Sequence, residues 1–201
     1  MRDILSASEH LLTDKEIEEI EEEAQKLKKQ NVLYFDTPRT VKKITETIDW
    51  VWNKHKKPML MFLDHSILVK KSAHHSSTTD MLYELGEEWN IIKKKFPVTG
   101  FIASQLNRDI ESADRKKVPA MHYPQKSDLS YSDSIYQVCD FCLISHIPYM
   151  LNLQFYGPQR LPCGQEDVYW HILKNRNNEA NKIIRMRADF KNMKIIERDG
   201  S

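Results

Sequence analysis

An apolar strand that ends in a polar cluster constrains the fold of this chain more than any other feature. The stretch Phe96–Arg108 begins as an apolar run and ends in Ser104-Gln105-Leu106-Asn107-Arg108. Buried strands usually end in Gly, Asn or Asp, because a turn needs those residues. This one ends in two amides and a guanidinium, which are hydrogen-bond donors. Open α/β sheets bind ligands at the carboxyl ends of their strands, so the cluster predicts a ligand site at that edge.

Helix and strand signals alternate before this cluster. Thr13 and Glu16 form a capping box, which opens a helix predicted to reach about Gln30. Pro58–Leu63 is continuously apolar, which is typical of a parallel strand buried on both faces. Further helices are expected at residues 40–55 and 80–95, and a further short strand at 32–35. The alternation predicts a parallel sheet with right-handed crossover connections.

Strands dominate the second half of the chain. They are expected at residues 141–145, 168–173, 183–187 and 193–197, the last two as a hairpin. A length of 201 residues suffices for one good core, so the chain, residues 1–201, is predicted to be one partial α/β domain. Its expected core is a parallel sheet flanked by helices with antiparallel strands at the C-terminal edge. That is the outline of a RecA-like fold, incomplete at its N-terminus.

Composition excludes several classes of protein. The chain carries 30 basic and 29 acidic side chains, which argues against wholesale coating of nucleic acid but permits a local basic groove. No apolar run approaches the ~20 residues of a membrane span, and no signal peptide is found. Three cysteines without a disulfide framework fit a reducing cytoplasm. Cys139 and Cys142 are expected in a strand, where they would point to opposite faces, so a metal or redox role is not favoured.

Several side chains offer groups that bind a nucleotide. Asp64 ends an apolar strand, where its carboxylate can hold magnesium beside a triphosphate or simply cap the next turn. Gln105 and Arg108 can sense a γ-phosphate or satisfy backbone groups at the strand end. Lys174 and Arg176 are expected at positions i and i+2 of a strand, so they share a face. There they can grip a phosphate or form a solvated edge.

Two basic loops leave the same end of the expected sheet. They can follow a nucleic-acid backbone, or they can be solvated charged loops without a ligand. The candidate contacts are Lys70, Lys71, Arg108, Arg115, Lys116 and Lys117. His74 and His75 lie in the first loop and are expected to be exposed, because adjacent residues rarely ligate together.

The order of these features along the chain is similar to that of the DnaB-like replicative helicases. The most specific matches are Ser104–Arg108 and Lys174-Asn175-Arg176-Asn177, preceded by the strand that ends at Asp64. The resemblance covers nearly all of the chain, and only the part of the family's motor domain that follows its phosphate loop. It implies an enzyme that unwinds DNA with ATP and magnesium, binds single-stranded DNA and forms a homo-oligomeric ring.

The resemblance also implies a role for each candidate residue. Asp64 matches the Walker B carboxylate that supports magnesium, and Gln105 matches the residue that reads the γ-phosphate and couples it to the DNA loops. Arg176 matches the arginine finger and Lys174 its partner, both of which act in trans on the neighbouring subunit's ATP. The loops after Asp64 and Arg108 match the segments that line the ring's channel. The implied location is the cytoplasm of a bacterial or phage-infected cell.

The chain also departs from the family pattern. No G-x-x-x-x-G-K-[ST] phosphate loop, no catalytic Glu and no N-terminal helical domain are found in it. We therefore expect it to be inactive alone and to need a complementing upstream helicase fragment. His65-Ser66-Ile67 and Ser130-Tyr131-Ser132-Asp133 replace family residues, and the second change weakens the case for DNA contact there. The open sheet is expected to leave an apolar face without a partner. That face comprises Leu60, Phe62, Phe101 and Ile102.

Two other functions remain compatible with the sequence. One is a non-enzymatic module that keeps the RecA-like shell for assembly or DNA binding. The other is a fragment of a recombination-type RecA-like ATPase. A phosphate loop encoded just upstream would favour the helicase, whereas an unrelated neighbour would favour the module.

Overall fold

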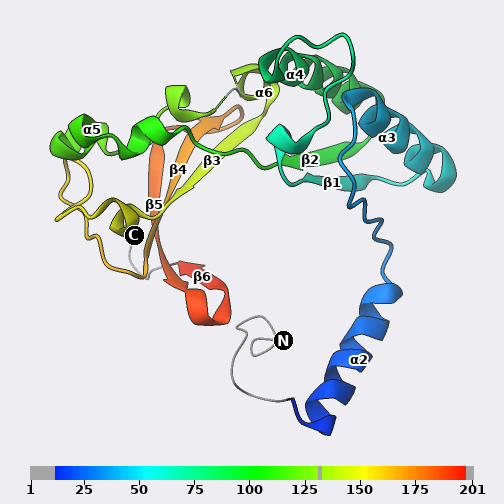
Figure 1. Cartoon of the computed structure of the whole chain (residues 1–201), viewed down its shortest axis with the longest axis horizontal. Helices are drawn as coiled ribbons and strands as arrows, with labels where there is room; N and C mark the ends of the chain where they lie inside the picture. Colours follow the sequence, from blue (N-terminus) through cyan, green and yellow to red (C-terminus); the bar gives the residue numbers. More distant parts are fainter. Residues whose placement is uncertain (1–11, 131–132, 198–201) are drawn as a thin grey trace.

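The computed structural model of the chain describes residues 12–130 and 133–197. Among these residues the strands form two sheets, which lie in different parts of the molecule (Figure 1). The parallel sheet pairs β1 (Met59–Leu63) with β2 (Val98–Ile102). The antiparallel sheet has the order β3 (Phe141–His146), β4 (Asp167–Asn175), β5 (Lys182–Asp189) and β6 (Lys194–Glu197). The predicted antiparallel strands are confirmed, and they form a sheet of their own.

Capping residues mark the starts of the three long helices. Thr13 caps α2 (Asp14–Lys28) in the expected capping box with Glu16, and Thr40 caps α3 (Val41–His55). Ser77 forms a second capping box with Asp80 at the start of α4 (Thr78–Lys95). Two shorter helices follow, α5 (Ala113–Lys117) and α6 (Asp133–Val138). The 3-10 helices are η1 (Ser66–Leu68), η2 (Arg108–Glu111), η3 (Pro119–Met121), η4 (Lys126–Asp128), η5 (Pro148–Leu151) and η6 (Phe190–Asn192).

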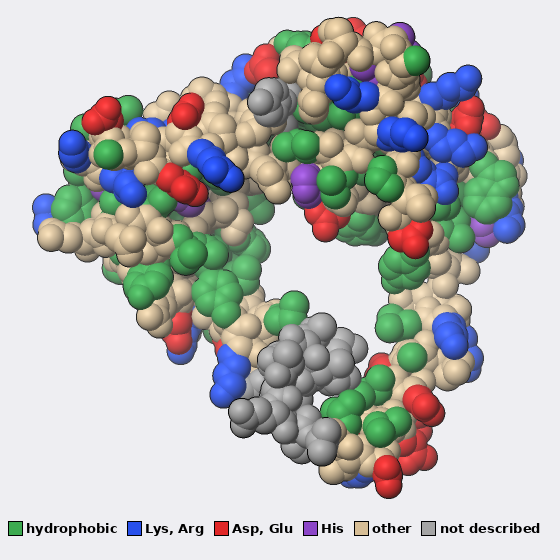
Figure 2. All heavy atoms as spheres, in the orientation of Figure 1, with side chains coloured by type: hydrophobic (Ala, Val, Ile, Leu, Met, Phe, Trp, Pro, Cys, Tyr) green, Lys and Arg blue, Asp and Glu red, His purple; other side chains and the backbone are tan. Residues whose placement is uncertain are grey.

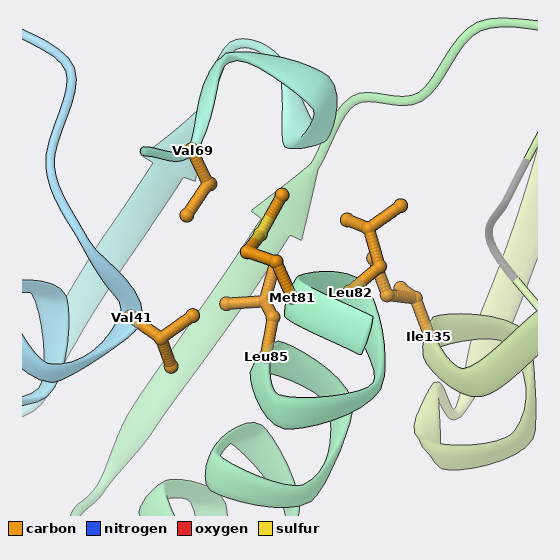
Figure 3. Close-up of a cluster of buried hydrophobic side chains, with 6 residues drawn as sticks. All are labelled: Val41, Val69, Met81, Leu82, Leu85 and Ile135. Atoms are coloured by element: carbon orange, nitrogen blue, oxygen red, sulfur yellow. The ribbon is translucent and has the colours of Figure 1, made fainter. Parts of the chain in front are cut away.

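The helices α3 and α4 cover one face of the parallel sheet (Figure 1). The helix expected at residues 80–95 is confirmed as α4, and its Leu82, Leu85, Trp89 and Ile92 are all buried. Met81 and Leu85 point toward Val41 of α3 and Val69, while Leu82 lies against Ile135 of α6 (Figure 3). Gly100 on β2 permits this packing, since a Cβ there would lie 2.1 Å from the ring of Trp89.

The other face of the parallel sheet is uncovered among the described residues. Leu60, Phe62 and Phe101 are 66%, 71% and 52% exposed, and the two phenylalanine rings stack 4.9 Å apart. Hydrophobic side chains gather on the side of β1 and β2 that faces away from α4 (Figure 2). The prediction that β1 is buried on both faces is therefore wrong here. The expected bare apolar face is confirmed for these three residues but not for Ile102, which packs into the core.

The segment between α2 and α3 differs from the prediction. The sequence predicts a strand at Val32–Phe35, but this stretch has no regular secondary structure, and its four side chains are exposed. A strand requires a hydrogen-bonded neighbour, and the described β1 pairs only with β2. The helix α2 has no buried residue and projects from the rest of the molecule (Figure 1).

The antiparallel sheet matches the strands expected in the second half of the chain. The predicted final hairpin is confirmed as β5 and β6, joined through η6. Cys142 lies in β3, but Cys139 precedes it, so the expectation that both belong to a strand is wrong for Cys139. All three cysteines are free thiols. None of the helices in the described part of the chain is long and apolar enough to cross a membrane.

Candidate functional site

Asp64 and Gln105 lie at the same edge of the parallel sheet. The strands β1 and β2 run in register to Leu63 and Ile102, so the chain leaves both at their carboxyl ends. The two exits are tied together, because Ala103 N donates to Leu63 O at 3.0 Å and Ser66 N donates to Ala103 O at 2.9 Å. Both the Asp64 carboxylate and the Gln105 amide are exposed there. Oxygen ligands on an open sheet edge have the donor chemistry that magnesium requires.

The backbone of the Gln105 segment is held by a second stretch of chain. Ser130 N donates to Gln105 O at 3.2 Å, and Asn107 N donates to Asp128 O at 2.7 Å. Between them Leu106 and Leu129 form an antiparallel bridge. The position of Gln105 therefore depends on the loop that contains Asp128.

A buried ion pair fixes that loop. Arg115 and Asp128 are 9% and 2% exposed, and the guanidinium binds both carboxylate oxygens, with Nη2 to Oδ2 at 3.0 Å. Arg115 also donates to the carbonyls of Met121 and Tyr123, each at 3.0 Å, and Asp128 accepts from Gln125 N at 2.7 Å. The predicted contact of Arg115 with nucleic acid finds no support here, because each of the three guanidinium nitrogens donates within the chain. Arg115 instead positions the segment behind Gln105.

Lys174 lies on the antiparallel sheet and Arg176 directly after its strand β4, both away from this edge. The Lys174 ammonium donates to the carbonyls of Tyr136 and Gln137 in α6, at 2.7 and 2.9 Å. Arg176 follows the end of β4, so the two do not share a strand face as expected, and it pairs with Asp140 at 2.7 Å. Both cations contact α6 or the residues just after it, and neither is bonded to Asp64 or Gln105.

The comparisons with known proteins decide the family. The sequence matches the family model for the DnaB-like helicase C terminal domain over residues 3–194. The chain belongs to this family. No curated protein matches the chain significantly.

Solved structures support the same fold for this DnaB-like chain. It matches a solved ATPase domain with a TM-score of 0.75 and 15% identity, covering 98% of this chain and 65% of that one. It matches "The Structure Of A DnaB-Like Replicative Helicase And Its Interactions With Primase" with a TM-score of 0.74 and 16% identity, covering 98% and 45%. At such identities the likeness shows the fold, which is the α/β architecture of RecA-like helicase domains. The chain spans less than two thirds of either structure.

The remaining basic candidates of the DnaB-like chain are better placed than Arg115. Lys70 and Lys71 follow β1, Arg108 follows β2, and all three are exposed. Lys117 on α5 is exposed and Lys116 is half-buried. Tyr131 and Ser132, where the family pattern is replaced, lie outside the described residues. The expectation of exposed histidines holds for His74 but is wrong for His75, whose side chain is only 3% exposed.

A buried polar cluster in the antiparallel part has no counterpart in the sequence analysis. The hydroxyl of Tyr156 lies 2.6 Å from His146 Nδ1 and 2.8 Å from His171 Nε2, and all three side chains are buried. Burial, reinforced by the charge of Arg115, lowers the pKa of His146 to about 4. Burial and the neighbouring His146 lower the pKa of His171 to about 3. The cluster is neutral at pH 7, and no local sequence signal marks it because its members are up to 25 residues apart.

Proposed function

We propose that this DnaB-like chain forms part of the ATP-driven motor of a replicative DNA helicase. The match to the DnaB-like helicase C terminal domain supports this assignment. The observation that carries the proposal is the joint exposure of Asp64 and Gln105 at the carboxyl edge of one parallel sheet. Sheets of this kind bind their ligands at that edge.

Asp64 and Gln105 would bind different parts of the nucleotide. The Asp64 carboxylate would hold magnesium, directly or through water, and the ion would neutralise charge on the phosphates of ATP. The Gln105 amide would donate to the γ-phosphate. Since the Gln105 and Asn107 backbone is bonded to Ser130 and Asp128, loss of that phosphate can be transmitted to the loop beyond.

Lys174 and Arg176 are proposed to act on a nucleotide held by a neighbouring subunit. Their location on the other sheet, beside α6, supports a role in trans. Arg176 is half exposed, so its guanidinium can exchange Asp140 for a phosphate at modest cost. This role requires a homo-oligomer, for which a ring is the arrangement we propose.

Single-stranded DNA is the proposed polymer substrate. Lys70, Lys71 and Arg108 leave the nucleotide edge on two adjacent loops, and Lys116 and Lys117 extend the charge along α5. Flexible cations of this kind bind the phosphate backbone without reading bases. Arg115 contributes indirectly, by holding the second loop.

The phosphate loop would come from another segment, on this chain's full-length protein or on a second polypeptide. The bare apolar face at Leu60, Phe62 and Phe101 supports this, because exposed patches of large apolar side chains commonly mark interfaces. The ATP site is therefore proposed to be completed there, and the 201 residues alone are expected to be inactive.

Steady-state ATPase assays test the proposal. The chain alone should give no turnover, whereas the chain with a complementing polypeptide that carries the family's phosphate loop should hydrolyse ATP on single-stranded DNA. Arg176→Ala should then lower the rate by a factor of about 10³ or more while leaving ATP binding intact. The matched control Arg187→Ala removes an exposed arginine from an ion pair on β5 and should have little effect.

Mixing experiments test the role in trans. Arg176→Ala mixed with a phosphate-loop variant should recover part of the activity, because each defect then falls in a different subunit's contribution. Full activity of Arg176→Ala, or Asp64-dependent hydrolysis by the chain alone, would contradict the proposal.

A further inference from the structure

Three potential metal ligands converge between the loop after β1 and the helix α4. They are His74, His75 and Glu84, and their ligand atoms all lie within 4.8 Å of one another. His74 Nε2 lies 2.9 Å from Glu84 Oε2, and His75 Nε2 contacts the same oxygen. A single ion could therefore reach all three with small side-chain movements.

A turn allows adjacent histidines to share this site. His75 N donates to Ser72 O at 3.1 Å, and Ser72 N donates to His75 Nδ1 at 2.9 Å. The turn brings the two imidazole rings together, with centroids 4.1 Å apart and their planes tilted by 45°. Both Nε2 atoms consequently point at Glu84, which an extended chain would prevent, since neighbouring side chains then alternate.

The burial of His75 supports the site. Its side chain is only 3% exposed, and its Nε2 contacts Glu84 Oε2, so the imidazole is held at the carboxylate and away from water. An ion bound between the imidazole and the carboxylate would satisfy both groups. We propose that His74, His75 and Glu84 bind a divalent transition-metal ion of the zinc class.

The ligand set selects the metal. Two imidazole nitrogens and one carboxylate suit zinc, which takes three protein ligands plus water in open sites. Magnesium prefers oxygen ligands, so it is a poor competitor here. His74 is 68% exposed, which leaves a side of the site open to water. The site is thus distinct from the magnesium position proposed at Asp64.

Metal binding has one identifiable cost. An imidazole that ligates through Nε2 carries its proton on Nδ1, so the hydrogen bond from Ser72 N must be released. A single hydrogen bond contributes far less free energy than the binding of an ion at a micromolar site. The exchange is favourable, and it predicts that the Ser72 amide becomes less protected when metal binds.

Bound metal would cross-link the loop to the first turns of α4. Glu84 is on the helix, while His74 and His75 are on the loop that begins at Lys70. Such a cross-link would restrain the loop that carries Lys70 and Lys71, and its relevance to DNA binding rests on the proposed function. The metal site itself does not depend on that function.

Calorimetric titration of the EDTA-treated 201-residue chain with zinc chloride tests the proposal. We expect one zinc ion per chain with micromolar or tighter affinity, unaffected by excess magnesium. His74→Ala and Glu84→Gln should each weaken zinc binding more than about tenfold. Loss of a residue that only supports a ligand already costs about that much, and these two are proposed to bind the ion directly. Cobalt titration should give the visible absorption of a tetrahedral site.

Matched controls separate this site from unspecific binding. His55→Ala removes an exposed histidine on α3, and Glu87→Gln an exposed carboxylate on the same helix as Glu84, so both should bind zinc like the wild type. His74 is exposed, so its variant should fold normally, which melting in EDTA checks. Absence of micromolar binding, or unchanged affinity in His74→Ala and Glu84→Gln, would overturn the proposal.

Discussion

The two sheets of this chain are stabilised in different ways. The parallel sheet is covered on one face by α3 and α4 and leaves Leu60, Phe62 and Phe101 bare on the other. The antiparallel part encloses the polar cluster of Tyr156, His146 and His171, and Tyr169, whose ring packs against that of Tyr156, is also fully buried. The antiparallel part is therefore closer to self-sufficient, whereas one face of the parallel sheet lacks a covering layer among the described residues.

The segment from Arg115 to Leu129, here called the Arg115 loop, connects the two parts. Its backbone pairs with the exit from β2 at Leu106 and Asn107. Its aromatic residues pack on the antiparallel part, where the ring of Tyr123 lies 4.9 Å from that of Tyr156 and 5.2 Å from that of His171. Changes at Arg115 should therefore affect both sheets, and changes elsewhere should affect one.

The largest effect is expected for Arg115→Ala. Removing the guanidinium leaves the Asp128 carboxylate buried without its partner, so the free energy of unfolding should fall by about 3–5 kcal/mol. Denaturant titration measures this, and hydrogen exchange should show weaker protection in both sheets. Lys117→Ala, an exposed change on the same helix, should stay within about 0.5 kcal/mol. Equal stability of the two variants would refute the connecting role of Arg115.

Acid should weaken the antiparallel part first. The folded pKa values of His146 and His171 lie below the unfolded value near 6.5, so the unfolded chain binds protons more readily. Their contribution to the free energy of unfolding is complete above pH 6.5 and is lost as the pH falls toward 4. For His146 the lowering of its pKa to about 4 corresponds to a loss of about 3 kcal/mol in the free energy of unfolding once the pH is below that value.

Hydrogen exchange at about pH 7 and pH 5 checks this prediction by region. Protection should fall in β3 and β4 before it falls in α4. The variant His146→Asn should flatten the pH dependence of stability between 6.5 and 4. The same slope in wild type and variant would exclude His146 as its source.

The smallest effect on stability is expected on the bare face of β1. Phe62→Ser should change the free energy of unfolding by less than about 0.5 kcal/mol, because the ring is 71% exposed, and should reduce self-association. Its neighbour Met61 packs into the core on the opposite face, so Met61→Ser should cost about 1–3 kcal/mol. Melting and sedimentation measure both. A large loss of stability in Phe62→Ser would mean that this face is already covered.

Much of the fold follows from local signals. The capping box at Thr13 and the strands of the second half lie where the sequence predicts, and α4 begins within two residues of its predicted start. The order of Asp64, Ser104–Arg108 and Lys174–Asn177 is sufficient to indicate the DnaB-like family, which the family match confirms. The strand predicted at Val32–Phe35 does not form. Its apolar residues have only a tendency to form a strand, and a strand also needs a neighbouring strand to pair with.

Features that depend on only a few neighbouring residues can be read from the sequence, such as caps, periodicity and polar groups that end strands. Which charged and polar groups meet across longer separations follows only from the fold. Arg115 meets Asp128 across 13 residues, Tyr156 meets His171 across 15, and His74 and His75 meet Glu84 only because a turn folds back on α4. The physical reason is that burial reverses the behaviour of such groups, since a side chain that would be solvated in a loop must find a partner once water is excluded.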